Sequence, residues 1–165
     1  MVNLIEPAVW APPGLPSYRH LLRYDTTAKA QIRPITHDLN DLIARLGVES
    51  GTLLAYSLHT TLGLFVQETA EPNLCEDFID FLNSLVEGDG AGYKHRCALH
   101  PSGACVEDRF NAPSHVRQML TNQSLVLDIE AGRVTLGPWQ DVAYVELDGP
   151  RRGRQIFLKI LAELP

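Results

Sequence analysis

The sequence has few cysteines and no long apolar run, and both absences limit what the protein can be. Its 165 residues include three cysteines, an odd number that cannot form a closed set of disulfides. We therefore expect reduced thiols and a cytoplasmic location. No apolar stretch approaches the roughly 20 residues that a membrane-spanning helix needs, so we expect no membrane partner. The first residues carry neither a basic leader nor a long apolar segment, which argues against a secretory signal.

Positive charge and nucleotide-binding motifs are scarce as well. The formal net charge is −6, whereas sequence-blind nucleic-acid binding needs a positive surface that displaces counterions, so we expect no nucleic-acid partner. The chain has no glycine-rich phosphate loop and no dinucleotide fingerprint, which removes most nucleotide-dependent functions. It also has no Gly-x-Ser-x-Gly elbow, so serine hydrolase chemistry is unsupported.

The composition that remains is that of one globular domain. Hydrophobic residues make up 45% and charged residues 21%, and 165 residues can close a core without disulfides or metal. Residues 1–16 contain four prolines, and we interpret them as an extended N-terminal arm. Residues 17–165 then form the single domain.

Short apolar segments alternate with two longer helical patterns and one short one. We expect strands at 18–26, 30–34, 52–58, 62–68, 124–130, 133–137, 142–148 and 154–163. We expect helices at 36–46, 72–86 and 113–121. Most strands are joined by hairpin-length connections, which favours an α+β fold with three helices and mostly antiparallel or mixed β-sheets.

Two details of these helices can be tested. Thr36 is a plausible N-cap of the first helix, and Gly47 is placed to end it in a left-handed conformation. In the second helix the apolar positions repeat with helical spacing, so we expect them to face the core. They are Leu74, Phe78, Phe81, Leu82 and Leu85. Residues 87–112 are loop-like, and a loop of that length in a compact domain is functional or disordered.

Three of the six histidines stand where chemistry is plausible. His59 ends an apolar strand, His95 lies in the long loop, and His115 falls in the first turn of the short helix. The positive end of that helix disfavours imidazolium, so we expect His115 to stay neutral and able to bind a metal or polarise a substrate oxygen. Each of the three can equally be a hydrogen-bonded structural residue.

The long loop also contains a Cys/His-rich stretch. His95, Cys97, His100 and Cys105 suggest zinc, but their spacing matches none of the paired Cys or His patterns of zinc sites. Thiols that merely pack in a loop explain the same residues.

Charged residues after two strands complete the candidates. Glu68 follows an apolar strand and can be a general base or a solvent-facing carboxylate. Arg151, Arg152 and Arg154 crowd a Gly-Pro turn, either as an anion site or as a solvated turn, because guanidinium binds phosphate and carboxylate bidentately.

Taken in order, these segments resemble the YjbQ-like family, the family linked to a secondary thiamine-phosphate synthase activity. The resemblance covers roughly residues 17 to 163 and is carried by an ordered set of short motifs. They are His59-Thr60-Thr61, Glu68 with Glu71-Pro72, Tyr93-Lys94-His95, Asn111 with His115, Leu136-Gly137-Pro138-Trp139-Gln140, and Glu146-Leu147-Asp148-Gly149-Pro150-Arg151.

The resemblance implies a homotrimer with a site near subunit contacts. The implied catalytic residues are His59, His95, His115 and Glu68, and the three histidines can also hold a divalent metal, zinc or magnesium. The implied substrate- or anion-binding residues are Thr60, Thr61, Asn111, Trp139, Gln140 and Arg151. The family usually has an aspartate shortly after the second histidine, whereas His95 is followed here by Arg96 and Cys97.

Two functions follow from this reading. The first is an enzyme that acts on a small phosphorylated or anionic substrate, for example by joining a pyrimidine pyrophosphate to a thiazole phosphate. The second is a non-catalytic trimeric module that binds a metal or an anion. In both cases we expect a phosphate or sulfate near His115 and Arg151, because the first turn of the short helix should offer unpaired N–H groups.

Overall fold

The computed structural model describes residues 16–86, 88, 92–96 and 110–163. The predicted N-terminal arm, apart from Pro16, and the loop residues Cys97, His100 and Cys105 lie outside these ranges. In chain order the elements are β1 (Ser17–Tyr24), β2 (Gln31–Pro34), α1 (Thr36–Leu46), β3 (Ser50–Ser57), β4 (Leu62–Gln67), α2 (Pro72–Leu85), α3 (Ala112–Gln118), β5 (Ser124–Glu130), β6 (Arg133–Val134), β7 (Asp141–Glu146) and β8 (Arg154–Ala162). Every element expected from the sequence is present, with small shifts at its ends.

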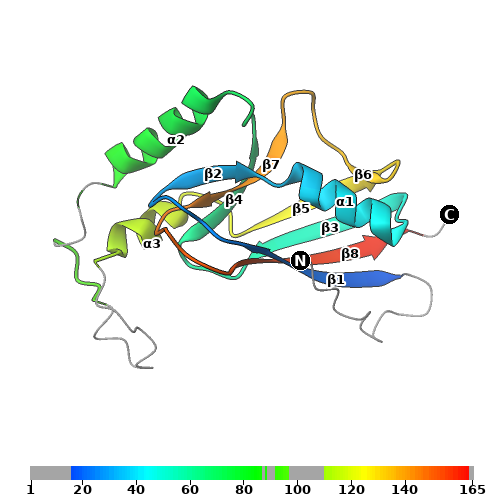
Figure 1. Ribbon diagram of the computed structural model, residues 1–165, viewed down its shortest axis with the longest axis horizontal. Coiled ribbons are helices and arrows are strands. Elements are labelled where there is room, and N and C mark those ends of the chain that lie inside the picture. The colour runs from blue at the N-terminus through cyan, green and yellow to red at the C-terminus, as the bar shows by residue number, and fades with distance from the viewer. Residues whose placement is uncertain (1–15, 87, 89–91, 97–109, 164–165) are drawn as a thin grey trace.

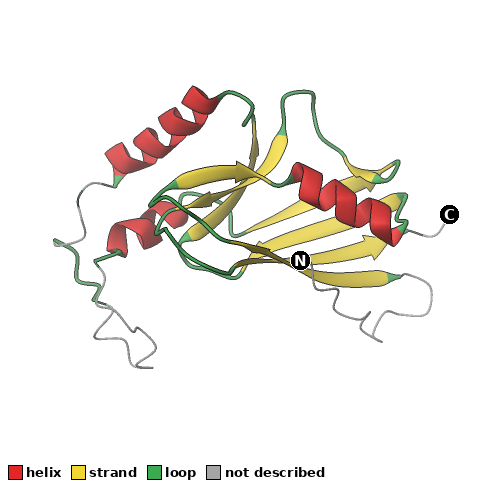
Figure 2. Cartoon of the chain, viewed as in Figure 1, coloured by secondary structure: helices red, strands yellow, loops and turns green. Residues whose placement is uncertain are grey.

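The strands form two sheets, and all the pairs between the described strands are antiparallel. The larger sheet has the order β1-β8-β3-β5-β6, and the smaller has the order β2-β7-β4. Helix α1 lies over the larger sheet at one end of the molecule, whereas α2 and α3 lie at the other end (Figures 1 and 2). This arrangement confirms the predicted α+β fold. No helix of the described residues is long and apolar enough to cross a membrane.

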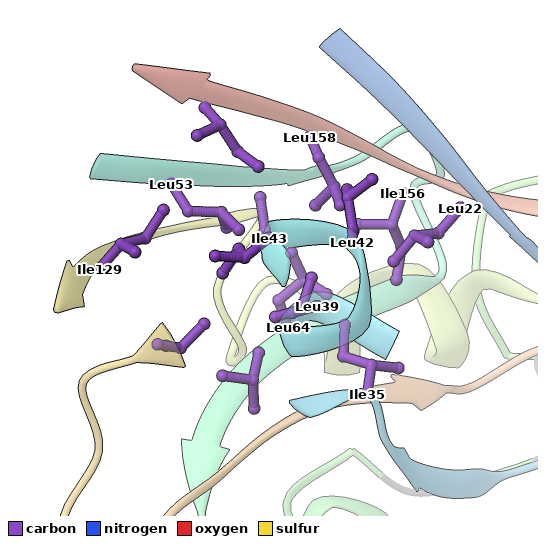
Figure 3. Packing of buried hydrophobic residues seen from close by; sticks show 14 of the residues in the cluster. Leu22, Ile35, Leu39, Leu42, Ile43, Leu53, Leu64, Ile129, Ile156 and Leu158 are labelled. Carbon is purple, nitrogen blue, oxygen red and sulfur yellow. The ribbon is translucent and has the colours of Figure 1, made fainter. Parts of the chain in front are cut away.

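The core fills the space between α1 and the two sheets. Its largest fully buried side chains include Leu39, Leu42 and Ile43 of α1, which face Leu53 and Leu158 of the larger sheet (Figure 3). In β8 buried and partly exposed residues alternate, as expected of a strand with one face on the core. A fully buried leucine or isoleucine is worth about 1.5–3 kcal/mol relative to its exposed state, so this apolar layer is the main stabilising feature of the domain.

The ends of α1 agree only in part with the sequence. Gly47 has φ 65° and its N–H donates to the carbonyl oxygen of Ala44, which confirms the left-handed C-cap. Thr36 is not the N-cap; that position belongs to Ile35, which has no side-chain cap. The Thr36 hydroxyl instead donates to Asp141 Oδ1 (2.8 Å) and accepts from the Val142 N–H (2.9 Å), so it ties α1 to β7.

Helix α2 is less buried than its pattern predicts. The Glu71 carboxylate caps it by accepting the N–H groups of Asn73 and Leu74, at 3.0 and 2.8 Å. Leu82 is its one buried residue, and Phe78 packs on Phe65 of β4 with ring centroids 5.4 Å apart. Three of the apolar residues expected in the core are exposed instead: Leu74 (38%), Phe81 (56%) and Leu85 (56%). Their helical spacing is real, but within one subunit nothing described covers them.

The smaller sheet has two ends that matter for function. The pairing of β4 with β7 sets Leu62 beside Glu146 at one end and Gln67 beside Asp141 at the other. Five residue steps of about 3.3 Å separate the two ends by roughly 17 Å. We call them the Glu146 end and the Asp141 end.

Candidate functional site

The loop that follows β3 is fixed by a small hydrogen-bond network. The Ser57 hydroxyl donates to the Leu62 carbonyl (2.7 Å) across the turn. The Gln123 amide donates to the carbonyls of Ser57 and His59, and it is itself held by Gln118 of α3 (2.7 Å). The loop carrying His59, Thr60 and Thr61 is therefore attached to the segment that contains α3.

His95 and His115 lie side by side. Their ring centroids are 5.1 Å apart and their planes meet at 76°, an edge-to-face contact. Together with Tyr93, Lys94, Ala112 and Val116 they line a pocket of about 340 Å³. Helix α3 holds the His115 side of this pocket, because Ser114 donates to the Leu147 carbonyl (2.6 Å) and the buried Arg117 donates to the Val86 carbonyl (2.6 Å).

His115 is poised to act as a neutral imidazole. Burial is the main cause that lowers its pKa, and the neighbouring His95 lowers it further, whereas Asp148 and a hydrogen bond to the Thr60 backbone oppose the shift. The direction agrees with the sequence prediction, and burial is the first cause. One ring N–H faces the Thr60 backbone, so the other ring nitrogen keeps its lone pair for a proton, a metal or a substrate N–H.

His59 directly precedes Thr60, whose backbone His115 contacts, but it has a different role. Its Nε2 accepts the Gln155 N–H at 2.8 Å, so in the neutral ring the proton is on Nδ1. Burial, followed by the charge of Arg154, lowers its pKa. With Nε2 engaged and Nδ1 protonated, His59 has no lone pair to offer a metal ion.

The predicted three-histidine metal centre therefore does not fit the described residues. Among them, no group of three or more His, Cys, Asp or Glu side chains is placed to hold a metal ion. His95 and His115 form a two-histidine pocket, and His59 supports the strand β8 beside it.

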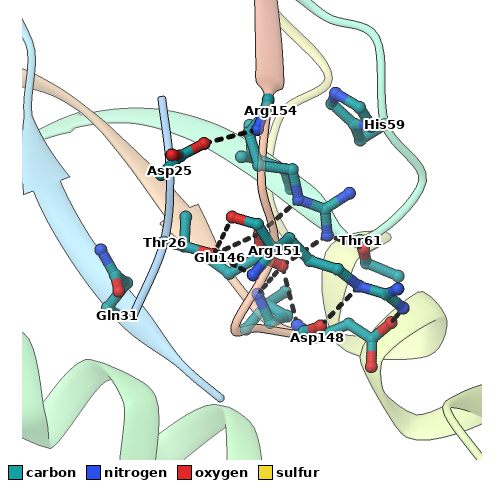
Figure 4. A network of polar contacts seen from close by, with 12 residues as sticks. Asp25, Thr26, Gln31, His59, Thr61, Glu146, Asp148, Arg151 and Arg154 are labelled. Atoms are coloured by element: carbon teal, nitrogen blue, oxygen red, sulfur yellow. Dashed lines mark hydrogen bonds and ion pairs between the residues drawn. The ribbon is translucent and has the colours of Figure 1, made fainter. Parts of the chain in front are cut away.

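A buried ion pair lies at the Glu146 end of the smaller sheet (Figure 4). Arg154 pairs with Glu146 through Nε and Nη2, and its Nη2 also donates to the Thr61 hydroxyl at 2.7 Å. Glu146 is fully buried and accepts two further backbone N–H groups, from Leu147 (3.0 Å) and Asp148 (2.9 Å). Arg154 and the Thr26 hydroxyl (3.4 Å) thus satisfy a buried carboxylate, and the Thr61 oxygen accepts one N–H of Arg154.

Arg151 is engaged in a similar way. Its Nη2 pairs with Asp148 Oδ2, its Nε donates to the Asp148 carbonyl (3.0 Å), and its backbone is tied to Thr26. Asn111 donates to the same Asp148 oxygen at 2.9 Å. Two of the predicted anion-binding residues therefore converge on one carboxylate.

The start of α3 also differs from the expectation of free N–H groups. The N–H groups of Ser114 and His115 both donate to the Asn111 carbonyl, at 3.0 and 3.3 Å, and Pro113 has none. These two N–H groups are therefore not free for an anion, which leaves, among the described residues, the Ala112 N–H as the donor of the first turn that has no such bond.

The remaining predicted site residues lie at the Asp141 end. Glu68 directly follows β4, and Trp139 and Gln140 directly precede β7. Trp139 is 73% exposed, and the Gln140 side chain accepts the Gly137 N–H at 2.8 Å. Within one subunit the structure does not bring these three residues to the histidine pair.

Sequence reasoning missed the residues that organise the Glu146 end. Glu146 and Asp148 were recognised only as parts of a motif. Glu146 directly follows the apolar run Val142–Val145 of β7, and a carboxylate buried there needs a partner. That requirement, together with three arginines a few residues later, was a usable signal for the Glu146–Arg154 pair. Ser57, Gln118 and Gln123 gave no comparable signal, because polar residues near turns are common.

Comparison with known proteins places this architecture in a family. A sequence profile of the family described as "UPF0047 protein YjbQ-like" matches residues 20–163. The chain belongs to the YjbQ-like UPF0047 family. A UPF0047 protein from Archaeoglobus fulgidus is 36% identical over 141 residues, which cover 83% of this chain and 99% of that protein. The resemblance stated from the motifs is confirmed.

Solved structures of YjbQ-like and related proteins have the same fold. A hypothetical protein from Aeropyrum pernix superposes with a TM-score of 0.73 at 30% identity, covering 88% of this chain and 98% of that one. A protein from Sulfolobus solfataricus, described as of unknown function, also gives 0.73, at 23% identity and with 90% and 99% coverage. At that identity the second likeness supports the fold alone.

Proposed function

We propose that the protein is a YjbQ-like enzyme that acts on a small phosphorylated or anionic substrate at the pocket of His95 and His115. The observation that carries the proposal is the pair itself: two imidazoles 5.1 Å apart, one of them held neutral by burial, over a pocket that Lys94 also lines. A neutral imidazole with one fixed N–H can accept a proton or position a substrate.

The reaction that the family resemblance suggests is of the thiamine-phosphate synthase type. The thiazole nitrogen attacks the methylene carbon of the pyrimidine as the carbon–oxygen bond to pyrophosphate breaks, so the electron pair leaves with pyrophosphate. Negative charge grows on the leaving oxygens, and cationic groups beside them stabilise the transition state. Lys94 is the cationic residue in the pocket lining. A protein-held metal is not part of this proposal, because the described residues do not form a ligand set.

A homotrimer fits the distribution of the site residues. The histidine pair is close to the Glu146 end, whereas Glu68, Trp139 and Gln140 lie at the Asp141 end of the same subunit. A single site containing both groups needs a second subunit to supply one of them. The exposed apolar residues Phe81 and Leu85 on α2 offer a surface for such a contact.

One test addresses assembly and site together. Light scattering should report a trimer for the native chain, and Phe81→Ser with Leu85→Ser should shift it to monomer. Val126→Ser removes an apolar residue that is still more exposed (73%) from β5 and is the control. Mixing His115→Ala subunits with Trp139→Ala subunits should restore part of the substrate turnover that each variant lacks alone. A monomeric native protein, or no recovery on mixing of correctly assembled subunits, contradicts the composite site.

The pairing of the arginines with carboxylates weighs against catalysis, so the second candidate function is a non-catalytic module that binds an anion at the pocket lined by Lys94, His95 and His115. Arg151 and Arg154 are both paired with carboxylates, which reduces the positive charge that either can offer a leaving pyrophosphate. Turnover of thiamine precursors by the purified protein separates the two candidates. Turnover that is lost in His115→Ala supports the enzyme, whereas anion binding without turnover supports the module.

A further inference from the structure

A second pocket lies away from the histidine pair. It has a volume of about 360 Å³, within the range of small-molecule sites, and forms between the end of β1, β2 and α1. The two pockets have no lining residue in common. In Figure 1, α1 and α3 lie at opposite ends of the molecule, so ligands in the two pockets would not compete.

The floor of this pocket is a fixed aromatic ring. Tyr24 is buried, and its hydroxyl donates to Asp38 Oδ2 at 2.7 Å. Burial, followed by that hydrogen bond, raises the pKa of Tyr24, so the phenol keeps its proton. The ring belongs to the last residue of β1 and is held in place by a hydrogen bond to the first turn of α1.

The aspartates that line the pocket already have partners. Asp38 accepts from Tyr24, Asp25 accepts the Gly153 N–H at 2.7 Å, and Asp41 lies 3.1 Å from Nδ1 of His37. Each of them has at least one oxygen engaged away from the arginines. Among the described residues, these three aspartates form no ion pair with the arginines that line the same pocket.

Three arginines also line the pocket, and none pairs with a carboxylate among residues 16–86, 88, 92–96 and 110–163. They are Arg23, Arg33 and Arg45. The Arg33 guanidinium lies 4.8 Å from the centroid of the Tyr24 ring, a stacking contact that leaves N–H groups at its edge. This contrasts with Arg151 and Arg154, which are both paired with carboxylates. A protein of net charge −6 thus gathers three guanidinium groups around one pocket, and within the part of the chain that the structure describes none of them forms an ion pair with the three aspartates there.

We propose that this pocket binds a small anionic molecule through its phosphate or carboxylate groups. Guanidinium binds both groups with two parallel hydrogen bonds, and the Tyr24 ring offers a flat apolar contact for the rest of the ligand. Phosphate and carboxylate are both small oxyanions, and the experiment below distinguishes between them.

Calorimetry with pyrophosphate and with citrate, each at about 150 mM salt to screen weak surface attraction, tests the proposal. The native protein should bind one of the two probes with unit stoichiometry at this pocket. Arg33→Gln with Arg45→Gln should weaken that binding at least about tenfold for each arginine, since each removes a charge-assisted contact. Preference for pyrophosphate identifies phosphate as the group recognised, and preference for citrate identifies carboxylate.

Two controls keep the result specific. Arg19→Gln with Arg133→Gln removes the same charge from exposed residues outside the pocket and should leave the affinity within about twofold. His115→Ala should also leave it unchanged, which separates this site from the histidine pocket. Circular dichroism confirms folding, and Arg45→Gln alone, at an exposed helix position, serves if the double variant does not fold. The proposal is overturned if neither probe binds, if the control pair weakens binding as much, or if only His115→Ala abolishes it.

Discussion

The buried pair of Glu146 and Arg154 makes a strong prediction about stability. We consider Arg154→Met, which keeps most of the apolar stem and removes the guanidinium. Glu146 then stays fully buried without its cation, although the N–H groups of Leu147 and Asp148 still donate to it. Breaking a buried ion pair from one side costs about 3–5 kcal/mol, and the remaining donors, which include the Thr26 hydroxyl, place the loss toward the lower value. For a domain of this size that lowers the Tm by roughly 6–20 °C.

The physical reason is tested by a second substitution. Glu146→Gln in the Arg154→Met background removes the stranded charge and keeps an amide oxygen that can accept the same backbone N–H groups. The double variant should therefore be more stable than Arg154→Met alone, by about 1–3 kcal/mol. Arg152→Met, an exposed neighbour, should change stability by less than about 0.5 kcal/mol.

Urea-induced unfolding followed by circular dichroism at pH 7.5 measures all four proteins on one scale. If Arg154→Met lowers the free energy of unfolding no more than Arg152→Met does, the ion pair does not stabilise the domain. If removing the carboxylate charge makes the single variant still less stable, the loss comes from packing.

Three further outcomes can be measured. Gly51→Ala should destabilise the domain much more than Gly47→Ala, as measured by urea unfolding. A Cβ at position 51 would lie 2.2 Å from a backbone oxygen of β8. Position 47 has open space, so Gly47→Ala should lower the free energy of unfolding by only about 1 kcal/mol, because of the positive φ there. Because the pKa of His59 is lower in the folded chain, the unfolded chain binds more protons below about pH 6.5. The free energy of unfolding should therefore fall as the pH drops below that value. His59→Gln should flatten this pH dependence between pH 7.5 and 5.5. His95→Ala should raise the pKa of His115, since it removes a like charge, and an unchanged NMR titration of His115 would show that the two rings do not interact.

Local chemistry explains why the fold was largely predictable. Alternation along β8 and the Gly47 stop of α1 depend only on neighbouring residues, and both appear as expected. The apolar stripe of α2 was recognised correctly, but periodicity cannot say whether the same subunit covers it. Phe81 and Leu85 show that here it does not.

The sequence indicated several of the residues of the candidate site, but not how their side chains are arranged. The sequence separation of His95 and His115 gives no sign that the rings meet, since a long loop joins them. The engagement of His59 with the Gln155 N–H depends on the turn after β3 and on the start of β8. Thr36 shows the same limit, because its role as a tie to β7 involves residues more than 100 positions away.

The position of β8 between β1 and β3 has a consequence for how the chain is made. Among the described strands β1 pairs only with β8, joining Ser17 to Leu161 and Tyr24 to Arg154, so it has no such partner until β8 has left the ribosome. The larger sheet therefore cannot assemble in the order of synthesis, and its closure requires contacts between distant parts of the chain, which slow folding. During that interval β1 exposes an unpaired edge, and its arginines Arg19 and Arg23 are the kind of charged side chains that keep such an edge from joining another chain.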